Sequence, residues 1–287
     1  MKEAASLPPL VSTGWLAERL TQPALRVLDA SWHLPTQGRD AAAEYAAGHV
    51  PGALFFDLDQ VSDPATSLPH MLPSSRSFSD AMSRLGLNDD DDIVVYDATG
   101  NNLSAARAWW MFRVFGHPRV ALLDGGLGKW RSEGRPLERG ATSLPPGRFS
   151  ARLDRQAVRN LREMRATLER GLEQVVDMRP AGRFAGTDPE PRAGLRGGHM
   201  PGSRSLPYVE LVAADGTLLP PDVLRSRLSA AGVDPTRPIV ATCGSGTSAC
   251  TLIHALHVLG YEGAALYDGS WTEWAAREDT PVVTGPA

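Results

Sequence analysis

The sequence predicts an α/β protein made of two tandem copies of one domain, each a parallel sheet with helices on both faces. Two observations lead to this fold class. First, four landmarks recur in the same order in both halves of the chain, at an offset of 144 to 150 residues. Second, short apolar runs alternate with longer helical patterns within each half, and this alternation is typical of βα units around a parallel sheet.

The repeat consists of four pairs of similar segments. The pairs are Val27–Asp29 with Val175–Asp177, Gly48–Gly52 with Gly198–Gly202, Ile93–Asp97 with Ile239–Cys243, and Leu123–Trp130 with Tyr267–Trp274. Because four matches in one order do not arise readily by chance, we predict one domain at 1–138 and a second at 158–287. The stretch between them, 139–157, contains prolines and glycines that are typical of a surface linker.

The elements of each domain follow from residue type and period. Short β-branched runs fit buried central strands, and longer runs with apolar residues at helical spacing fit helices. The predicted strands include Leu25–Leu28, Ile93–Tyr96, Val120–Leu123 and Ile239–Thr242. The predicted helices include Ser104–Phe115, Asp154–Arg170 and Thr247–Leu259. In parallel sheets, ligands bind where loops leave the carboxyl ends of strands, and Cys243 occupies such a position.

Composition and charge exclude several classes of function. The 287 residues carry a net charge of -4 at pH 7, which gives no attraction to nucleic acid or to an anionic membrane surface. No apolar run reaches the roughly 18 residues of a membrane span, and the first residues lack the apolar core of a signal peptide. Two cysteines are too few for a disulfide framework or a cysteine-rich metal site, so we expect a cytoplasmic protein without a metal.

Cys243 is the candidate nucleophile. It follows a predicted strand and precedes Gly244-Ser245-Gly246 and then a helix. Glycine adopts positive φ without steric cost, so the loop can turn successive N–H groups toward the sulfur. Those groups and the positive end of the helix favour the thiolate, which is the reactive form of cysteine. Cys250 lies within the helix among apolar residues, and we expect it to be an inert core residue.

A cysteine in a loop between a strand and a helix is also typical of one class of phosphatase. Such an enzyme needs an arginine six positions after the cysteine, where the planar guanidinium clamps phosphate with two hydrogen bonds. That position is Ala249 in this chain. The sequence therefore argues against a phosphatase.

Several motifs resemble those of the tandem-domain rhodanese superfamily, and within it the 3-mercaptopyruvate sulfurtransferases. In the first half the motifs are Asp57-Leu58-Asp59-Gln60, His70-Met71-Leu72-Pro73, Trp109–Arg113 and Leu123–Leu127. In the second half they are Gly182-Arg183-Phe184, Pro189-Glu190-Pro191-Arg192 and the loop that begins at Cys243. The resemblance covers nearly the whole chain and implies two rhodanese-like domains.

The resemblance implies an enzyme that moves sulfane sulfur from 3-mercaptopyruvate to Cys243, where a persulfide forms, and releases pyruvate. The sulfur then passes to a thiol, to cyanide or to a protein such as thioredoxin, and no cofactor takes part. The first domain has Asp97 at the position of Cys243. A carboxylate cannot hold sulfur as a persulfide, so the resemblance implies that this domain is catalytically silent.

The family's site residues have counterparts here. By resemblance, Arg183 and Arg192 bind the carboxylate and keto oxygen of the substrate, and we expect both on a loop because glycine and prolines surround them. Ser245, His70 and Asp59 correspond to a proton relay, which would place the active site between the two domains. The remaining loop residues are expected to contact the substrate; they are Gly244, Gly246, Thr247 and Ser248.

The loop sequence also bears on the sulfur donor. Rhodaneses that prefer thiosulfate typically have arginine and lysine directly after the cysteine, whereas this chain has the neutral pair Gly244-Ser245. Fewer cations weaken the attraction for a dianion, which favours mercaptopyruvate over thiosulfate. Thr247-Ser248 departs from the usual Val-Thr and puts this preference in doubt. A thiosulfate:cyanide sulfurtransferase and a non-catalytic rhodanese-like binding module stay open as alternatives.

Overall fold

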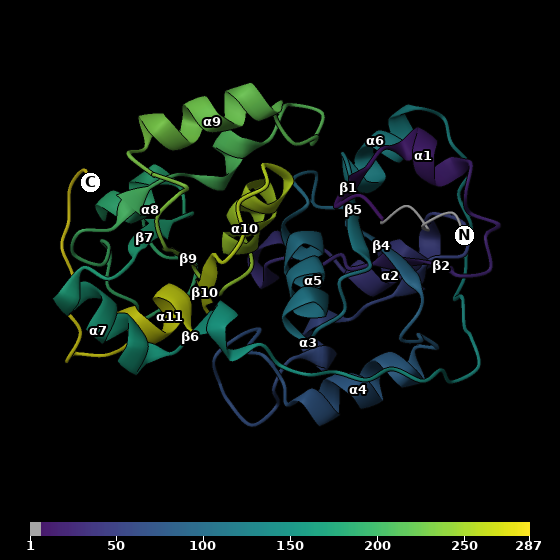
Figure 1. The fold of residues 1–287 in the computed structure, drawn as a ribbon, viewed down its shortest axis with the longest axis horizontal. Coiled ribbons are helices and arrows are strands. Elements are labelled where there is room, and N and C mark those ends of the chain that lie inside the picture. Colours follow the sequence, from purple (N-terminus) through teal and green to yellow (C-terminus); the bar gives the residue numbers. More distant parts are fainter. Residues whose placement is uncertain (1–6) are drawn as a thin grey trace. The chain divides into compact units, whose positions relative to one another are not determined.

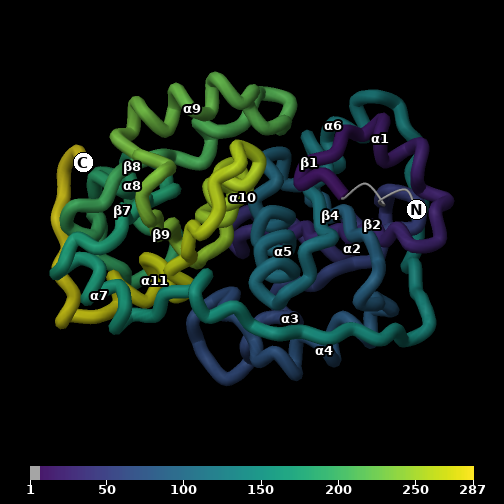
Figure 2. The backbone as a smooth tube through the Cα atoms, in the orientation of Figure 1, coloured from purple at the N-terminus to yellow at the C-terminus, as the bar shows by residue number. Residues whose placement is uncertain are grey.

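A computed structural model describes residues 7–287, which form two compact units (Figures 1 and 2). Unit 1 contains the chain up to Val61 together with Pro73–Leu153 and Ala214–Thr217. Unit 2 contains Ser62–Leu72, Asp154–Ala213 and Leu218–Ala287. Each unit has one five-stranded parallel sheet flanked by helices, so the predicted fold class is confirmed.

The sheet of unit 1 has the strand order β1-β5-β4-β2-β3, and every pair is parallel. Its strands are β1 (Leu10–Val11), β2 (Leu25–Asp29), β3 (Leu54–Phe55), β4 (Asp92–Tyr96) and β5 (Val120–Leu123). The three strands that we predicted for this half are therefore confirmed. They form the centre of the sheet because their β-branched and leucine side chains are buried on both faces.

Helices cover both faces of this sheet. They are α1 (Thr13–Ala17), α2 (Ala41–Ala47), α3 (Leu58–Val61), α4 (Ser75–Arg84), α5 (Leu103–Val114) and α6 (Gly126–Ser132), with a 3-10 turn at Pro35–Gln37. Because side chains alternate along a strand, β4 serves two cores. Val94 and Tyr96 pack in a cluster that contains Trp130 of α6, whereas α5 packs against β4 and β5.

Unit 2 repeats this architecture with the order β6-β10-β9-β7-β8, again parallel throughout. The strands are β6 (Val158–Arg159), β7 (Gln174–Asp177), β8 (Arg204–Ser205), β9 (Ile239–Thr242) and β10 (Ala265–Tyr267). The helices are α7 (Leu161–Arg170), α8 (Ala181–Ala185), α9 (Pro221–Ala230), α10 (Ala249–Val258) and α11 (Ser270–Ala275), with 3-10 turns at Arg155–Ala157 and Tyr208–Leu211. Strand order and direction thus match between the halves, as the sequence repeat predicts.

The predicted helix over Asp154–Arg170 is wrong in its first part. Residues Val158–Arg159 form the edge strand β6, which pairs with β10, a strand more than one hundred residues later in the chain. The helix begins only at Leu161, after Asn160, whose side chain accepts the Glu163 N–H while the Glu163 carboxylate accepts the Asn160 N–H. A two-residue edge strand has no period of its own, so the sequence pattern hides it.

The part of the predicted linker that precedes Asp154 packs against unit 1. Phe149 is buried, the Gly147 N–H donates to the Ser83 carbonyl at 2.8 Å, and the Arg152 N–H donates to the Phe115 carbonyl at 2.8 Å. The two units meet in the sequence at Leu153 and Asp154. The limits 1–138, 139–157 and 158–287 stay a prediction.

Candidate active site

Cys243 lies at the carboxyl end of β9, directly after Thr242, and the residue is 2% exposed. A five-residue loop follows, and α10 begins at Ala249 instead of at Thr247 as predicted. The loop is therefore slightly longer than the sequence pattern indicates. It contains every residue that we predicted after the cysteine, at the edge of the sheet where parallel sheets bind ligands.

The start of α11 holds the cysteine loop in place. The Cys243 N–H donates to Ser270 Oγ at 3.3 Å, and the Cys243 carbonyl accepts the Trp271 N–H at 2.9 Å. The Gly244 carbonyl accepts both the N–H of Thr272, at 3.0 Å, and its hydroxyl, at 2.6 Å. Ser270 is fully buried with φ of 49°, a left-handed conformation that serine rarely adopts. The sequence reasoning missed Ser270 and Thr272.

Several backbone amides of the loop keep their N–H groups available for a hydrogen bond to a ligand. Within residues 7–287, the N–H groups of Ser245, Thr247 and Ser248 donate to no protein acceptor. Gly246 has φ of 74°, so it makes the turn that glycine was predicted to allow. These amides precede the ten-residue helix α10, whose N-terminal end favours negative charge. The loop can therefore stabilise a thiolate, a persulfide anion or an anionic substrate.

Arg183 and Arg192 both lie beside the cysteine loop. A methyl group placed on Gly244 would lie 3.1 Å from Arg183 Nη2 and 4.0 Å from Arg192 Nη1. The structure thus brings the two predicted arginines together next to the residue that follows the nucleophile. Arg192 lies in irregular structure, as expected, but Arg183 lies on α8, so the expectation that both sit on a loop is wrong for Arg183. Pro180 starts this short helix, and Gly186 ends it.

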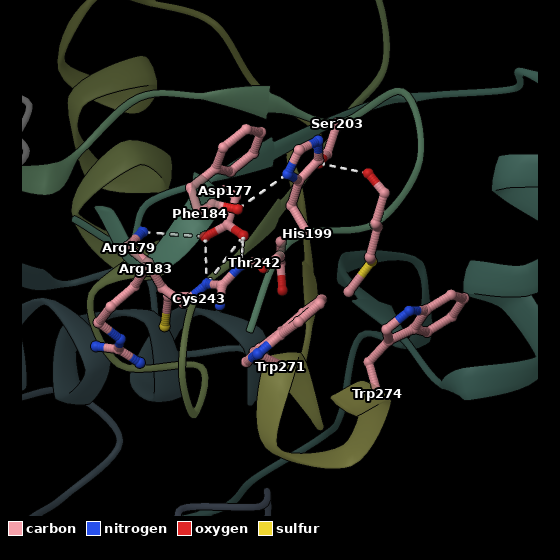
Figure 3. Close-up of polar contacts among 12 residues, drawn as sticks. Asp177, Arg179, Arg183, Phe184, His199, Ser203, Thr242, Cys243, Trp271 and Trp274 are labelled. Atoms are coloured by element: carbon pink, nitrogen blue, oxygen red, sulfur yellow. Dashed lines mark hydrogen bonds and ion pairs between the residues drawn. The ribbon is translucent and has the colours of Figure 1, made fainter. Parts of the chain in front are cut away.

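A chain of ion pairs fixes Arg183. Arg183 contacts Glu190 at 2.5 Å, and Glu190 contacts Arg179 at 2.7 Å. Arg179 in turn contacts Asp177 at 2.6 Å, and these two residues are labelled in Figure 3. Asp177, Arg179 and Glu190 are almost fully buried, whereas the Arg183 side chain is 19% exposed. The three buried residues therefore form a rigid support, from which the guanidinium of Arg183 reaches the cysteine loop.

Arg179 is the centre of this chain. Its guanidinium lies 4.1 Å from the centroid of the Trp271 ring and donates to the Gly198 carbonyl at 2.7 Å. Burial opposes its charge, but the carboxylates of Asp177 and Glu190 outweigh burial and hold the pKa of Arg179 above its ordinary value. Arg179 is therefore a permanent cation that anchors Glu190. The sequence reasoning missed this role, although Glu190 stood in one of the quoted motifs.

Tyr208 feels the charge of Arg183, and the sequence reasoning missed this residue. It begins the 3-10 turn Tyr208–Leu211, and its N–H donates to the Met178 carbonyl at 3.1 Å. Burial raises the pKa of Tyr208, and the positive charge of Arg183 opposes this rise. The phenol is therefore neutral near pH 7. No pattern in the sequence marks it.

His70 belongs to unit 2, although it comes from the first half of the sequence. Its Nδ1 lies 3.1 Å from Ser245 Oγ, which brings two of the three predicted relay residues together. The ring is 2% exposed, and the backbone of His70 has φ of 61°. Two residues later, the Leu72 N–H donates to Asp268 Oδ2 at 2.8 Å and anchors the segment.

Asp59, the third predicted relay residue, belongs to unit 1. Its carboxylate accepts the indole N–H of Trp32 at 2.9 Å. The participation of Asp59 in the relay stays a prediction. Cys250 is fully buried on α10 with its sulfur 3.2 Å from the Gly246 carbonyl, so the prediction that it is a core residue is confirmed.

In unit 1, the loop equivalent to the cysteine loop is occupied by the side chain of Asp97. Asp97 follows β4 as Cys243 follows β9, and it is 1% exposed. Its carboxylate accepts the N–H of Thr99 at 2.8 Å and the hydroxyl of Thr99 at 2.6 Å. It also accepts the Ala105 N–H at 2.9 Å and the Ser104 hydroxyl at 3.1 Å. The carboxylate thus satisfies the donors at the start of α5.

We expect Asp97→Ala to destabilise unit 1 by about 3 kcal/mol, because it leaves buried donors without an acceptor. Thermal unfolding should show the loss as a lower midpoint. Asp90→Asn is the matched control, since Asp90 is exposed on the turn before β4. An unchanged midpoint for Asp97→Ala would contradict this structural role.

Over residues 7–287, no three histidine, cysteine, aspartate or glutamate side chains gather in a way that could hold a metal ion. Within the same range, no helix has the length and apolar character needed to cross a membrane.

Both halves of the chain match the model of the rhodanese-like domain, at residues 12–133 and 160–277. The chain therefore belongs to the rhodanese family and contains two rhodanese-like domains. A crystal structure of SseA from Escherichia coli, described as a 3-mercaptopyruvate sulfotransferase, superposes with a TM-score of 0.84 at 41% sequence identity. That match covers 92% of this chain and 99% of the other.

Two curated relatives narrow the class further. The human 3-mercaptopyruvate sulfurtransferase is 43% identical over 93% of this chain and 92% of its own length. The bovine thiosulfate sulfurtransferase is also 43% identical, again over 93% of this chain and 92% of its own length. Overall identity therefore points to a sulfurtransferase but does not separate the two sulfur donors.

Proposed function

We propose that this protein is a sulfurtransferase that takes sulfane sulfur from 3-mercaptopyruvate onto Cys243, releases pyruvate, and passes the sulfur to a thiol or to cyanide. One observation carries the proposal: a buried cysteine begins a loop with open amides, and two arginines lie against the next residue. That arrangement supplies a nucleophile, a site for a sulfur anion and a site for a carboxylate.

In the first step, the Cys243 thiolate attacks the substrate sulfur. A sulfur–sulfur bond forms, the carbon–sulfur bond breaks, and its electron pair passes to carbon to give the enolate of pyruvate. The thiol proton of the substrate moves through Ser245 to His70 Nδ1 and returns to the enolate carbon, so charge and protons balance. The products are pyruvate and a Cys243 persulfide anion.

The arginines and amides stabilise different parts of this reaction. Arg183 and Arg192 bind the carboxylate and the keto oxygen, on which negative charge grows as the enolate forms. The N–H groups of Ser245, Thr247 and Ser248 hold the persulfide anion until an acceptor arrives. Gly244 leaves room for the arginines, and Gly246 makes the turn. In the second step, the acceptor thiolate or cyanide attacks the outer sulfur and regenerates the Cys243 thiolate.

The charge balance of the site favours mercaptopyruvate as donor. Asp177 and Glu190 already offset the charges of Arg179 and Arg183, and no cation follows Cys243 directly in the loop. The monoanion mercaptopyruvate suits this balance better than the dianion thiosulfate, which would lack a compensating charge in a partly desolvated site. Thiosulfate:cyanide sulfurtransferase activity is the second candidate, and the bovine relative favours it.

We expect kcat/KM for mercaptopyruvate to exceed that for thiosulfate by about 10- to 100-fold, taking a hydrogen bond to a charged group as worth about 1.5–3 kcal/mol. Both donors should be measured on one preparation, with the Cys243→Ser variant as the blank for non-enzymatic transfer. A higher kcat/KM for thiosulfate would replace the first candidate by the second. No turnover with either donor would favour a non-catalytic binding module.

The proposal also covers the molecule that accepts the sulfur and the cellular compartment of the protein. A cytoplasmic protein with a reduced thiol can pass persulfide sulfur to small thiols or to the exposed cysteine of a protein such as thioredoxin. The small number of cysteines, two in 287 residues, agrees with a reducing compartment.

A further inference from the structure

We infer that Thr247 is a second relay hydroxyl that shares His70 with Ser245 and can replace it. The inference rests on the proposed sulfur transfer and concerns its proton step. Thr247 Oγ1 lies 3.0 Å from His70 Nδ1, and Ser245 Oγ lies 3.1 Å from the same nitrogen. All three side chains are buried, with 8%, 7% and 2% exposure for Thr247, Ser245 and His70.

One ring nitrogen cannot serve two hydroxyls fully at the same time. Nδ1 offers either one lone pair or one N–H, depending on the tautomer, so both hydroxyls share a single hydrogen-bonding position. Their distances differ by too little to give either one priority. When one hydroxyl is removed, the other can take the whole interaction without any movement of the ring.

The surroundings of His70 keep the ring in this shared position. The left-handed backbone at His70 and the Leu72–Asp268 hydrogen bond fix the segment that presents the ring. On the other side, α10 begins directly after Ser248 and fixes the end of the loop. Neither partner can therefore move away to favour one hydroxyl, which makes the two arrangements similar in energy.

Thr247 also marks a difference from the usual loop, in which valine follows the second glycine. Valine and threonine have nearly the same shape, so valine would fill the same space but leave Ser245 as the one hydroxyl at His70 Nδ1 within this loop. The presence of Thr247 in place of this valine therefore affects the transfer of the proton and not the choice of sulfur donor. In the proposed step, either hydroxyl passes its proton to Nδ1 as it takes the proton of the substrate thiol, and the proton returns to the enolate carbon by the same route.

The test is a double-mutant cycle with Ser245→Ala and Thr247→Val, measured with mercaptopyruvate and excess thiol acceptor. We expect each single variant to lose less than about fivefold in kcat, and the double variant to lose about 100-fold, which is within the usual range for a proton-transfer group. KM should change little in all three, since the arginines that bind the carboxylate are untouched. Such a loss in the double variant exceeds the product of the single losses, which is at most about 25-fold, by about fourfold or more.

Conservative variants separate a relay from a packing role. In the Ser245→Ala background, Thr247→Ser keeps a hydroxyl and should keep most of the activity, whereas Thr247→Val should lose it. Thermal unfolding of each variant shows whether the fold is intact. If the double variant does not fold, the comparison of Ser245→Ala with Ser245→Ala/Thr247→Ser and with wild type still decides whether a hydroxyl at position 247 sustains turnover.

Three results would overturn the inference. A Ser245→Ala variant as inactive as the double variant would show that Thr247 cannot replace Ser245. Single variants that each lose the full 100-fold would show that the hydroxyls act in series. A Thr247→Val variant faster than wild type would make Thr247 a competitor of Ser245. Failure of the proposed function is distinct from all three, because the wild-type protein itself would then not release pyruvate.

Discussion

Replacing Cys243 by serine should abolish turnover with every donor, by at least about 10⁴-fold. An alcohol holds its proton far more tightly than a thiol, and an oxygen at this position cannot store sulfur as a persulfide. The loop itself should survive the change, because it is held by the backbone of Cys243 and Gly244 and by α11, not by the sulfur. Pyruvate release from mercaptopyruvate gives the direct measurement.

The matched control for this variant is Cys250→Ser. Cys250 is as buried as Cys243 and lies seven residues later on α10, but it has no place in the reaction. We expect Cys250→Ser to keep most of the activity and to take up sulfur as the wild type does. Mass spectrometry after incubation with donor should show one added sulfur atom on wild type and on Cys250→Ser, and none on Cys243→Ser. Retained turnover or sulfur uptake in Cys243→Ser would refute the nucleophile assignment.

Truncation of Arg183 should produce the second largest effect, on substrate binding. We expect Arg183→Ala to raise KM for mercaptopyruvate by about 10- to 100-fold, because a hydrogen bond between charged groups is worth about 1.5–3 kcal/mol. A second cause adds to the first: the buried carboxylate of Glu190 loses one of its two cations and repels the substrate anion. Steady-state kinetics that separate KM from kcat measure the effect.

Two further variants make this prediction specific. Arg225→Ala is the control for loss of an arginine, since Arg225 is exposed on α9, and KM should not change. Arg183→Ala combined with Glu190→Gln removes the repulsive carboxylate as well, so KM should recover in part. If Arg183→Ala leaves KM at the wild-type value, Arg183 does not bind the substrate.

The sequence alone was sufficient for the architecture. Repeated landmarks and short β-branched runs are local signals, and they located the central strands of unit 1 to within one residue at each end. The candidate nucleophile could be predicted locally as well, since a cysteine between a strand and a glycine-rich loop is recognised from consecutive residues. The edge strand β6 was missed because two residues carry no period and its partner lies far along the chain.

The arrangement around Cys243 was decided by the tertiary structure. Ser270 contacts Cys243 and Thr272 contacts Gly244 only because β10 brings α11 back to the end of β9. Glu190 links Arg183 to the buried Arg179, and these contacts depend on how the irregular segment that contains Glu190 folds. Such partners cannot be predicted from the order of residues, because hydrogen bonds and ion pairs depend on distance in space.

The sequence by itself determined that this chain has two rhodanese-like domains and one candidate nucleophile, Cys243, where the other domain has Asp97. It did so because repeats, periods and loop composition are properties of neighbouring residues. Only the tertiary structure decided that Asp97 fills its own loop and that Thr247 and Ser245 share one nitrogen of His70. The physical reason is that His70 comes from a segment 175 residues before Ser245, and packing alone brings its ring to both hydroxyls.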